Sequence, residues 1–87
     1  MDYIFRAQFE PDPEGGIIVT FPDVPEAITG GRNFVEAHAN AIEALGLALR
    51  GILALDRPLP RPATREDGLV PVPVEAGTAL KLAVIEA

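Results

Sequence analysis

The side chains of this sequence that could do chemistry are mainly carboxylates near its beginning. Four of them lie in or beside proline-containing segments: Asp12, Glu14, Asp23 and Glu26. Carboxylates hold divalent metal ions when several converge within about 4 Å of them, and exposed carboxylates also attract the cationic groups of a partner. Asp12 and Glu14 lie in a predicted turn and Asp23 follows a predicted strand, a spacing that does not indicate convergence on a metal ion. We therefore expect solvated turn acids or contacts to a basic partner, and we predict no catalytic residue, metal site or cofactor.

The chain has a single histidine, His38, and no cysteine. The absence of cysteine excludes disulfides, thiolate metal sites and a cysteine nucleophile. One histidine without cysteines or clustered acids is a poor metal site, because stable sites need several ligands. We therefore expect His38 to have a structural role, at the edge of the core or in a contact between subunits.

Most of the negative charge lies in the first third of the chain. Residues 1–30 contain six acids and one arginine, which gives −5 of the formal net charge of −6. Such a surface repels the phosphates of nucleic acids and attracts a basic protein. The distribution argues against direct nucleic-acid binding by residues 1–87 and is compatible with a basic protein partner. A solvated acidic face that keeps the protein soluble is the alternative explanation.

The length of 87 residues suits one small domain. A domain of this size buries only about 60–65% of its unfolded surface, so a hydrophobic contact between copies would add stability. The N-terminus shows no basic stretch followed by an apolar run, and the apolar-rich segment 41–55 is interrupted by charged residues and glycines. The sequence therefore predicts neither a signal peptide nor a membrane span, and with the absence of disulfides it favours the cytoplasm.

The first thirty residues predict three strands. Aromatic and small apolar residues alternate with largely polar ones over 3–10, and this period of two predicts a half-buried strand. Proline, glycine and acidic residues over 11–16 indicate a turn, and a second β-rich run follows over 17–21. These two runs predict an antiparallel hairpin, and we expect a short third strand near 26–30.

A long helix is predicted over 34–55, where no proline occurs. Asn33 with Glu36 three residues later resembles a capping box, which marks a helix N-terminus. One helical stripe is apolar: Phe34, Ala37, Ala41, Leu45, Ala48, Ile52 and Leu55. Beside this stripe stand further apolar residues, which we expect to exceed what one sheet face can cover: Val35, Ile42, Leu49 and Leu53. We therefore predict a second contact surface for this helix, either another helix or another copy of the chain.

The C-terminal third begins with a predicted linker and an edge strand. Alternating prolines over 58–62 indicate an extended linker. Pro71 and Pro73, two residues apart, remove the hydrogen-bond donors from one edge of the strand predicted over 69–74. This strand can therefore pair on one side only, and we expect it at an edge of the sheet.

The last predicted element is a short helix over 78–87, whose Leu80 and Val84 are further candidates for a contact between copies. The elements together predict an α+β fold of the order β-β-β-α-β with this C-terminal helix added. In it, a three-stranded antiparallel sheet is joined by the proline-containing edge strand, and one long helix packs on the sheet.

Seven short segments follow one another in a recognisable order along the chain. They are DPEGG at 12–16, VTFPDVP at 19–25, TGG at 29–31, EA at 36–37, NA at 40–41, EAL at 43–45 and VPVPV at 70–74. In this order they resemble the HicB family of bacterial antitoxins. The resemblance covers nearly the whole chain, and the combination is far more specific than any single segment.

The resemblance implies a partial ribonuclease H fold over residues 1–76. It also implies a function, which is to bind and inhibit HicA, a small basic toxin that cleaves mRNA with a histidine. Many relatives carry a further DNA-binding domain, and residues 77–87 resemble the first helix of such a domain, either truncated or lost here. A fold of the ribonuclease H type raises the question of two-metal nuclease chemistry, but the inward side of the first predicted strand carries no acid.

We therefore predict a non-enzymatic antitoxin of a type II toxin–antitoxin pair, which covers the basic RNA-binding surface of its toxin. The candidate toxin contacts are Asp12, Glu14, Asp23 and Glu26. The candidate contacts in a homo-oligomer, a dimer or larger, are Val35, Ile42, Leu49, Leu53, Leu80 and Val84. One alternative is the oligomerising part of a DNA-binding autorepressor whose reading domain is missing from the chain. Another is a free-standing oligomerisation domain with no toxin.

The chain itself should bind neither duplex DNA nor RNA, because its acidic first third opposes phosphate contacts. An electrophoretic mobility-shift experiment at about 150 mM salt tests this prediction, and no shift is expected with micromolar protein. A shift of duplex DNA at sub-micromolar protein would mean that the C-terminal residues supply a reading surface that the sequence does not reveal.

Overall fold

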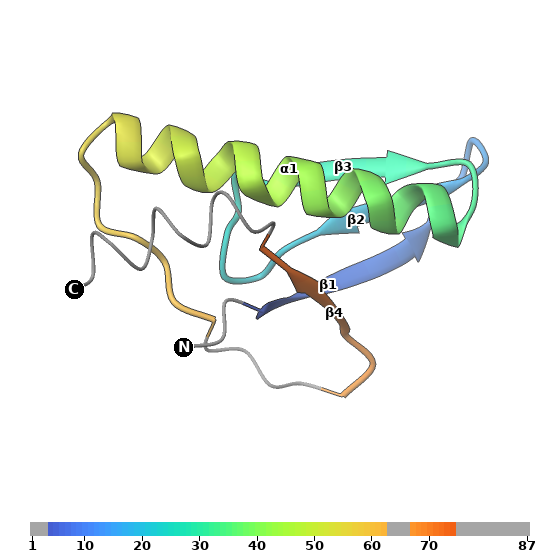
Figure 1. Cartoon of the computed structure of the whole chain (residues 1–87). Coiled ribbons are helices and arrows are strands. Elements are labelled where there is room, and N and C mark those ends of the chain that lie inside the picture. Colours follow the sequence, from blue (N-terminus) through green and yellow to red (C-terminus); the bar gives the residue numbers. More distant parts are fainter. Residues whose placement is uncertain (1–3, 63–66, 75–87) are drawn as a thin grey trace.

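The computed structural model describes residues 4–62 and 67–74, which form one sheet covered by one helix. Helix α1 lies across one face of the antiparallel sheet (Figure 1). The elements are β1 Ile4–Pro11, β2 Ile17–Thr20, β3 Ile28–Gly31, α1 Phe34–Ala54 and β4 Val70–Pro73. This order confirms the predicted α+β fold. The helix expected over 78–87 lies outside the described residues.

The last strand, β4, pairs with the first strand, β1. The sheet has the order β3-β2-β1-β4, and each neighbouring pair is antiparallel. β1 and β2 form the predicted hairpin, in which Phe9 lies opposite Val19. On its other side β1 pairs with β4, which places Val72 opposite Phe5. The two ends of the described chain therefore meet in the sheet, with β1 as a central strand.

β3 begins two residues later than predicted, at Ile28 rather than Glu26. Two backbone hydrogen bonds account for the difference. The N–H of Val24 donates to the carbonyl of Phe21 at 3.1 Å, and the N–H of Ala27 donates to the carbonyl of Val24 at 2.9 Å. These turns hold the chain as far as Ala27, whose side chain is buried, so pairing with β2 starts at the next residue.

β4 is an edge strand, as its prolines predict. Pro71 and Pro73 are exposed, while Val72 between them is fully buried on the helix side. Proline has no N–H to donate, so the edge of β4 that faces away from β1 presents no donor at these two positions. A further strand therefore cannot add to this edge in a regular ladder, which protects it from edge-to-edge association.

The N-terminus of α1 is fixed by the predicted cap. Asn33 has extended backbone angles, and its side-chain oxygen accepts the N–H of Glu36 at 2.9 Å. This bond satisfies one of the backbone donors that a helix leaves open at its first turn. No helix in the described ranges is long and apolar enough to cross a membrane.

The C-terminus of α1 is capped by backbone hydrogen bonds, and the residue in the left-handed conformation there is not a glycine. The N–H of Asp56 donates to the carbonyl of Leu53, and the N–H of Arg57 donates to that of Ile52, both at 3.1 Å. This pair of bonds is the Schellman arrangement, in which the residue after the cap adopts a left-handed conformation. Asp56 takes that position with φ 54°, a conformation that aspartate tolerates better than most residues.

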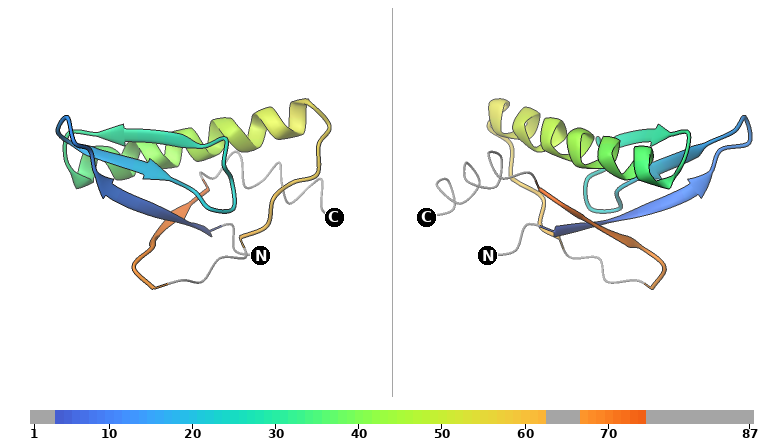
Figure 2. Two further views of the ribbon diagram at one scale, coloured as in Figure 1. Left: turned by 180° about the vertical axis from the view of Figure 1, so that it is seen from behind. Right: turned by 45° about the vertical axis from the view of Figure 1, so that its right-hand side comes forward.

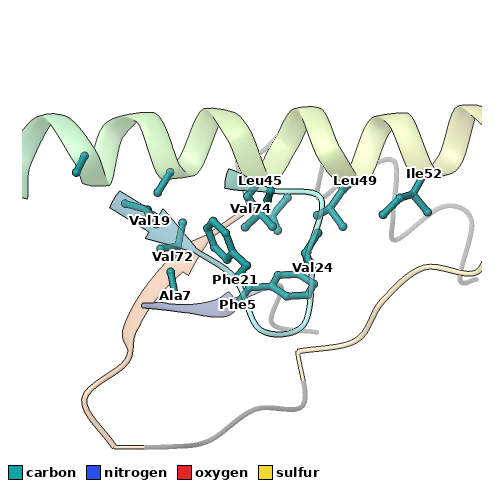
Figure 3. Close-up of a cluster of buried hydrophobic side chains, with 13 residues drawn as sticks. Phe5, Ala7, Val19, Phe21, Val24, Leu45, Leu49, Ile52, Val72 and Val74 are labelled. Carbon is teal, nitrogen blue, oxygen red and sulfur yellow. The ribbon is translucent and has the colours of Figure 1, made fainter. Parts of the chain in front are cut away.

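The core lies between α1 and the sheet (Figure 3). The strands contribute Phe5, Ala7, Val19 and Val72, and Phe21 and Val74 directly follow β2 and β4. The turn between β2 and β3 contributes Val24 and Ala27. The helix contributes Ala37, Ala41, Leu45, Leu49 and Ile52. Four of the five helical residues belong to the predicted stripe, but its two end members, Phe34 and Leu55, are 49% and 65% exposed.

Leu49 lies inside the core and not on the outer apolar face of α1 that the sequence predicts. It is 1% exposed (Figure 3). It follows Leu45 by four residues and precedes Ile52 by three, so the helical repeat puts all three on one face. Leu49 is therefore not on the surface of the domain.

α1 approaches β3 very closely at Gly31. A Cβ atom at this position would lie 2.5 Å from the backbone nitrogen of Ala37 and 2.8 Å from its Cα. Ala37 has no exposed surface, and its small side chain allows the same approach from the helix side. Gly31 is therefore required by close contact between two backbones.

Gly31→Ala should destabilise the domain by about 1–3 kcal/mol, because the added methyl group can be accommodated only by moving the helix away from β3. Chemical denaturation measures the loss. Gly51→Ala is the matched control, since Gly51 lies in the helix with nothing within 4 Å of its Cβ position. It should stabilise the domain by up to about 1 kcal/mol through helix propensity. Equal effects of the two substitutions would contradict the close approach.

Candidate functional site

The four acidic residues singled out in the sequence fall at opposite ends of β2. Asp12 and Glu14 lie in the loop between β1 and β2, and Asp23 and Glu26 lie in the turn between β2 and β3. These two connections are at opposite ends of the sheet (Figure 1). The structure therefore does not gather the four carboxylates into one site but forms two acidic sites, which we call the hairpin groove and the far turn.

The hairpin groove is an open depression where the β1–β2 loop meets the end of β3 and the start of α1. Its lining includes Asp12, Glu14, Gly16, Gly31, Arg32 and Glu36. An added Cβ at Gly16 would lie 2.6 Å from the carbonyl oxygen of Gly31, so the loop rests directly on β3. The groove therefore combines acids from the hairpin with charges from the helix N-terminus.

The loop that carries Asp12 and Glu14 has a defined backbone. The Asp12 carboxylate accepts the N–H of Glu14 at 2.9 Å, an Asx turn. The backbone of Asp12 is bonded twice more, to the N–H of Gly15 at 2.9 Å and to the carbonyl of Gly16 at 3.0 Å. Both glycines have positive φ, 106° and 82°, which the tight turn requires. Asp12 and Glu14 are therefore presented from a loop that is already ordered by its own hydrogen bonds.

Arg32 and Glu36 form an ion pair in the same groove. The Glu36 carboxylate accepts from Nη2 of Arg32 at 3.0 Å, from its Nε at 3.2 Å and from its backbone N–H at 3.1 Å. These hydrogen bonds from Arg32 lower the pKa of Glu36, and the same side-chain bond raises the pKa of Arg32. A capping box would turn Glu36 towards the N–H of Asn33, so the spacing indicated a role for Glu36 but did not identify Arg32 as its partner.

The far turn places Asp23 and Glu26 beside the segment that follows α1. Together with Arg57, Pro58 and Pro60 they line a shallow hollow. Asp23 is half-buried and Glu26 is exposed. The far turn therefore has two acids next to one arginine, whereas the hairpin groove has three acids and one arginine that is already paired.

His38 lies between α1 and the edge strand. Its Nε2 is 3.2 Å from the carbonyl oxygen of Pro71 in β4. Its ring stacks with Phe9 and Phe34, with centroids 6.2 and 5.9 Å away, and those two rings are 5.0 Å apart. These contacts tie the start of the helix to β1 and β4. Among the described residues, no group of three or more histidine, cysteine or acidic side chains is placed to hold a metal ion.

The apolar residues expected in a contact between copies do not form one surface. Val35 is 79% exposed, whereas Ile42 and Leu53 are half-buried against the core. Leu49 lies inside the core, as described above, and Leu80 and Val84 lie outside the described residues. The homo-oligomer stays a prediction, and of these side chains Val35 alone is largely exposed in the part of the chain that the structure describes.

The fold and its two acidic sites define a small acidic α+β domain of the β-β-β-α-β type. Comparison with protein families gives this class a more specific identity. The family described as the HicB-like antitoxin of bacterial toxin–antitoxin systems matches residues 4–83, and the chain belongs to this family.

Curated relatives agree with the family. The chain is 38% identical over 78 residues to Antitoxin HicB 2 of Photorhabdus laumondii, covering 90% of this chain and 55% of the relative. It is 36% identical over 74 residues to Antitoxin HicB of Escherichia coli, covering 83% and 54%. Antitoxin HicB 1 of Photorhabdus laumondii is also 36% identical over 74 residues, covering 85% and 48%. The chain therefore spans about half the length of the curated relatives it matches.

The ion pair in the hairpin groove should make part of the stability depend on pH. Because the folded-state pKa of Glu36 is lowered, its contribution is complete above the ordinary pKa of 4.5 and is lost as the pH falls through the lowered value. Acidification from about pH 7 to about pH 3 should therefore lower the stability of the original domain more than it lowers the stability of the Glu36→Gln variant.

Glu43→Gln is the control for this experiment, since Glu43 is exposed on the same helix and has no ion pair among the described residues. Thermal unfolding at the two pH values measures both variants. The prediction fails if Glu36→Gln and Glu43→Gln change the acid sensitivity equally.

Proposed function

We propose that this chain is the antitoxin part of a toxin–antitoxin pair and that it binds a small, basic, mRNA-cleaving toxin of the HicA type. The observation that carries the proposal is the hairpin groove, which presents fixed carboxylates in the most acidic third of the chain. Membership of the HicB-like antitoxin family supports the antitoxin role. The resemblance of the sequence segments to the HicB family implies that the toxin is of the HicA type.

The hairpin groove is the better candidate of the two acidic sites for the toxin contact. Arg32 is paired with Glu36, while Asp12 and Glu14 make no ion pair among the described residues. Their loop is held by its own hydrogen bonds, so a partner would order little backbone on binding. In the far turn, Asp23 and Glu26 share their hollow with Arg57, which weakens the local negative potential.

Inhibition follows from competition for one surface. A toxin that binds RNA needs a basic surface for the phosphates. An acidic domain that docks on this surface excludes RNA and blocks access to the catalytic histidine that the resemblance implies. The chain then acts by binding, without a catalytic step of its own, and it acts in the cytoplasm, where the mRNA substrate is.

The alternative of a DNA-binding autorepressor applies to the whole protein rather than to this domain. The curated relatives extend well beyond the matched segment. The described residues form an acidic α+β domain. Binding of DNA by a further domain therefore stays a prediction that rests on the resemblance alone.

The association rate with a small basic toxin of the HicA type should fall as salt rises, because opposite charges steer the encounter. Asp12→Asn with Glu14→Gln should slow association several-fold and flatten the salt dependence. The amide at position 12 can still accept the N–H of residue 14, so the loop should keep its shape. Surface plasmon resonance at several salt concentrations measures the rates, and loss of RNA cleavage measures inhibition.

Two further variants serve as controls. Glu43→Gln removes one exposed acid elsewhere and should leave association unchanged. Asp23→Asn with Glu26→Gln should have a smaller effect than the hairpin variant. If RNA cleavage continues unchanged with excess domain, the antitoxin proposal is wrong. If the far-turn variant has the larger effect, the contact lies at the other end of the sheet.

A further inference from the structure

Two large apolar side chains at the N-terminus of α1 are exposed. Phe34 is 49% exposed and Val35 is 79% exposed. The first turn of α1 and the β1–β2 loop lie at the same end of the sheet, as both views of Figure 2 show. The hairpin groove therefore has an apolar neighbour at its own end of the molecule.

This apolar surface is continuous with the hairpin groove. Phe34, Val35 and Glu36 follow one another around the first turn of α1. Successive residues of an α-helix are rotated by about 100°, so Val35 lies on the outer side of the helix between the other two. Glu36 lines the groove, where it is paired with Arg32. A partner that covers the groove and the first helical turn would therefore contact acidic and apolar side chains together.

The ring of Phe34 is held in place by its own neighbours. Its centroid lies 5.0 Å from that of Phe9 and 5.9 Å from that of His38. His38 in turn contacts the carbonyl oxygen of Pro71 at 3.2 Å. A side chain that is already fixed loses little conformational freedom when a partner covers it. Phe34 is therefore suited to be a rigid apolar contact in an interface.

We infer that Phe34 and Val35 form an apolar anchor for the basic toxin, beside the carboxylates of the hairpin groove. This inference rests on the proposed function and assigns the two groups of residues to different steps of binding. Exposed charges mainly raise the association rate, whereas a water-excluding apolar centre mainly determines how slowly a complex dissociates. The toxin surface that fits here has an apolar centre bordered by lysine or arginine side chains.

Charge favours a basic protein as the partner at this anchor. In the groove beside it, Asp12 and Glu14 make no ion pair among the described residues, and the charge of Arg32 is balanced by Glu36. Two copies of the chain that met here would bring these acids together, and their charges would also repel a nucleic acid or an anionic membrane. A basic protein surface is attracted by the same acids.

Surface plasmon resonance with a toxin of the HicA type separates the two steps. Phe34→Ala should raise the dissociation rate about tenfold or more and Val35→Ala several-fold, with the association rate changed less than about twofold. Asp12→Asn with Glu14→Gln should mainly lower the association rate. Leu47→Ala is the matched control and should leave both rates unchanged, since Leu47 is 56% exposed on the same helix but about 20 Å from Phe34 along its axis.

Circular dichroism confirms that each variant is folded, and Val35→Ala tests the anchor without removing the ring contacts of Phe34. The inference is overturned if both anchor variants dissociate as slowly as Leu47→Ala while the unchanged chain binds the toxin; the proposed function would then stand. It is also overturned if sedimentation velocity shows that the anchor variants alter self-association and leave toxin dissociation unchanged. A chain that binds no toxin of this type would contradict the proposed function, and the inference with it.

Discussion

The contact between Gly31 and Ala37 sets the distance between α1 and the sheet, and the rest of the domain depends on that distance. A Cβ atom at Gly31 would lie 2.5 Å from the backbone of the helix. Because the two backbones approach closely at this point, the space between helix and sheet along the rest of α1 is filled by side chains such as Leu45 and Phe5. Close packing of this kind tolerates little change in volume, so a larger residue at Gly31 would disturb the packing between α1 and the sheet.

The same contact organises the hairpin groove. Only Arg32 and Asn33 separate the end of β3 from the first residue of α1, so the helix must start directly beside the β1–β2 loop. The cap at Asn33 fixes the direction of the first turn, and the ion pair of Arg32 with Glu36 forms at that corner. The acids of the loop therefore face a helix N-terminus whose own charges are already paired. This leaves the loop carboxylates as the part of the groove that can attract a cationic partner.

The surfaces open to a partner follow from how few layers the described residues form. Within residues 4–62 and 67–74, one helix covers one face of the sheet, and both ends of β2 lie outside this contact (Figure 2). The prolines of β4 close one edge of the sheet, and His38 ties the helix to that strand. A small domain of this kind gains stability from association with a partner.

The sequence by itself determined the elements whose signals are local: the alternation in β1, the cap at Asn33, and the prolines that make β4 an edge strand. It also determined the family, because the characteristic segments occur in order along the chain. Tertiary structure alone decided that β4 lies beside β1, that Leu49 is inside the core, and that the four acids divide between two ends of the sheet.

The physical reason is the range of the interactions. Periodicity, capping and missing donors act within a few residues and can be recognised in the sequence. Which strands become neighbours, and which face of a helix is buried, depends on packing between segments far apart in the chain. Ile28 and Glu36 have ordinary sequence surroundings, and only the folded arrangement shows that one is exposed and that the other is paired with Arg32.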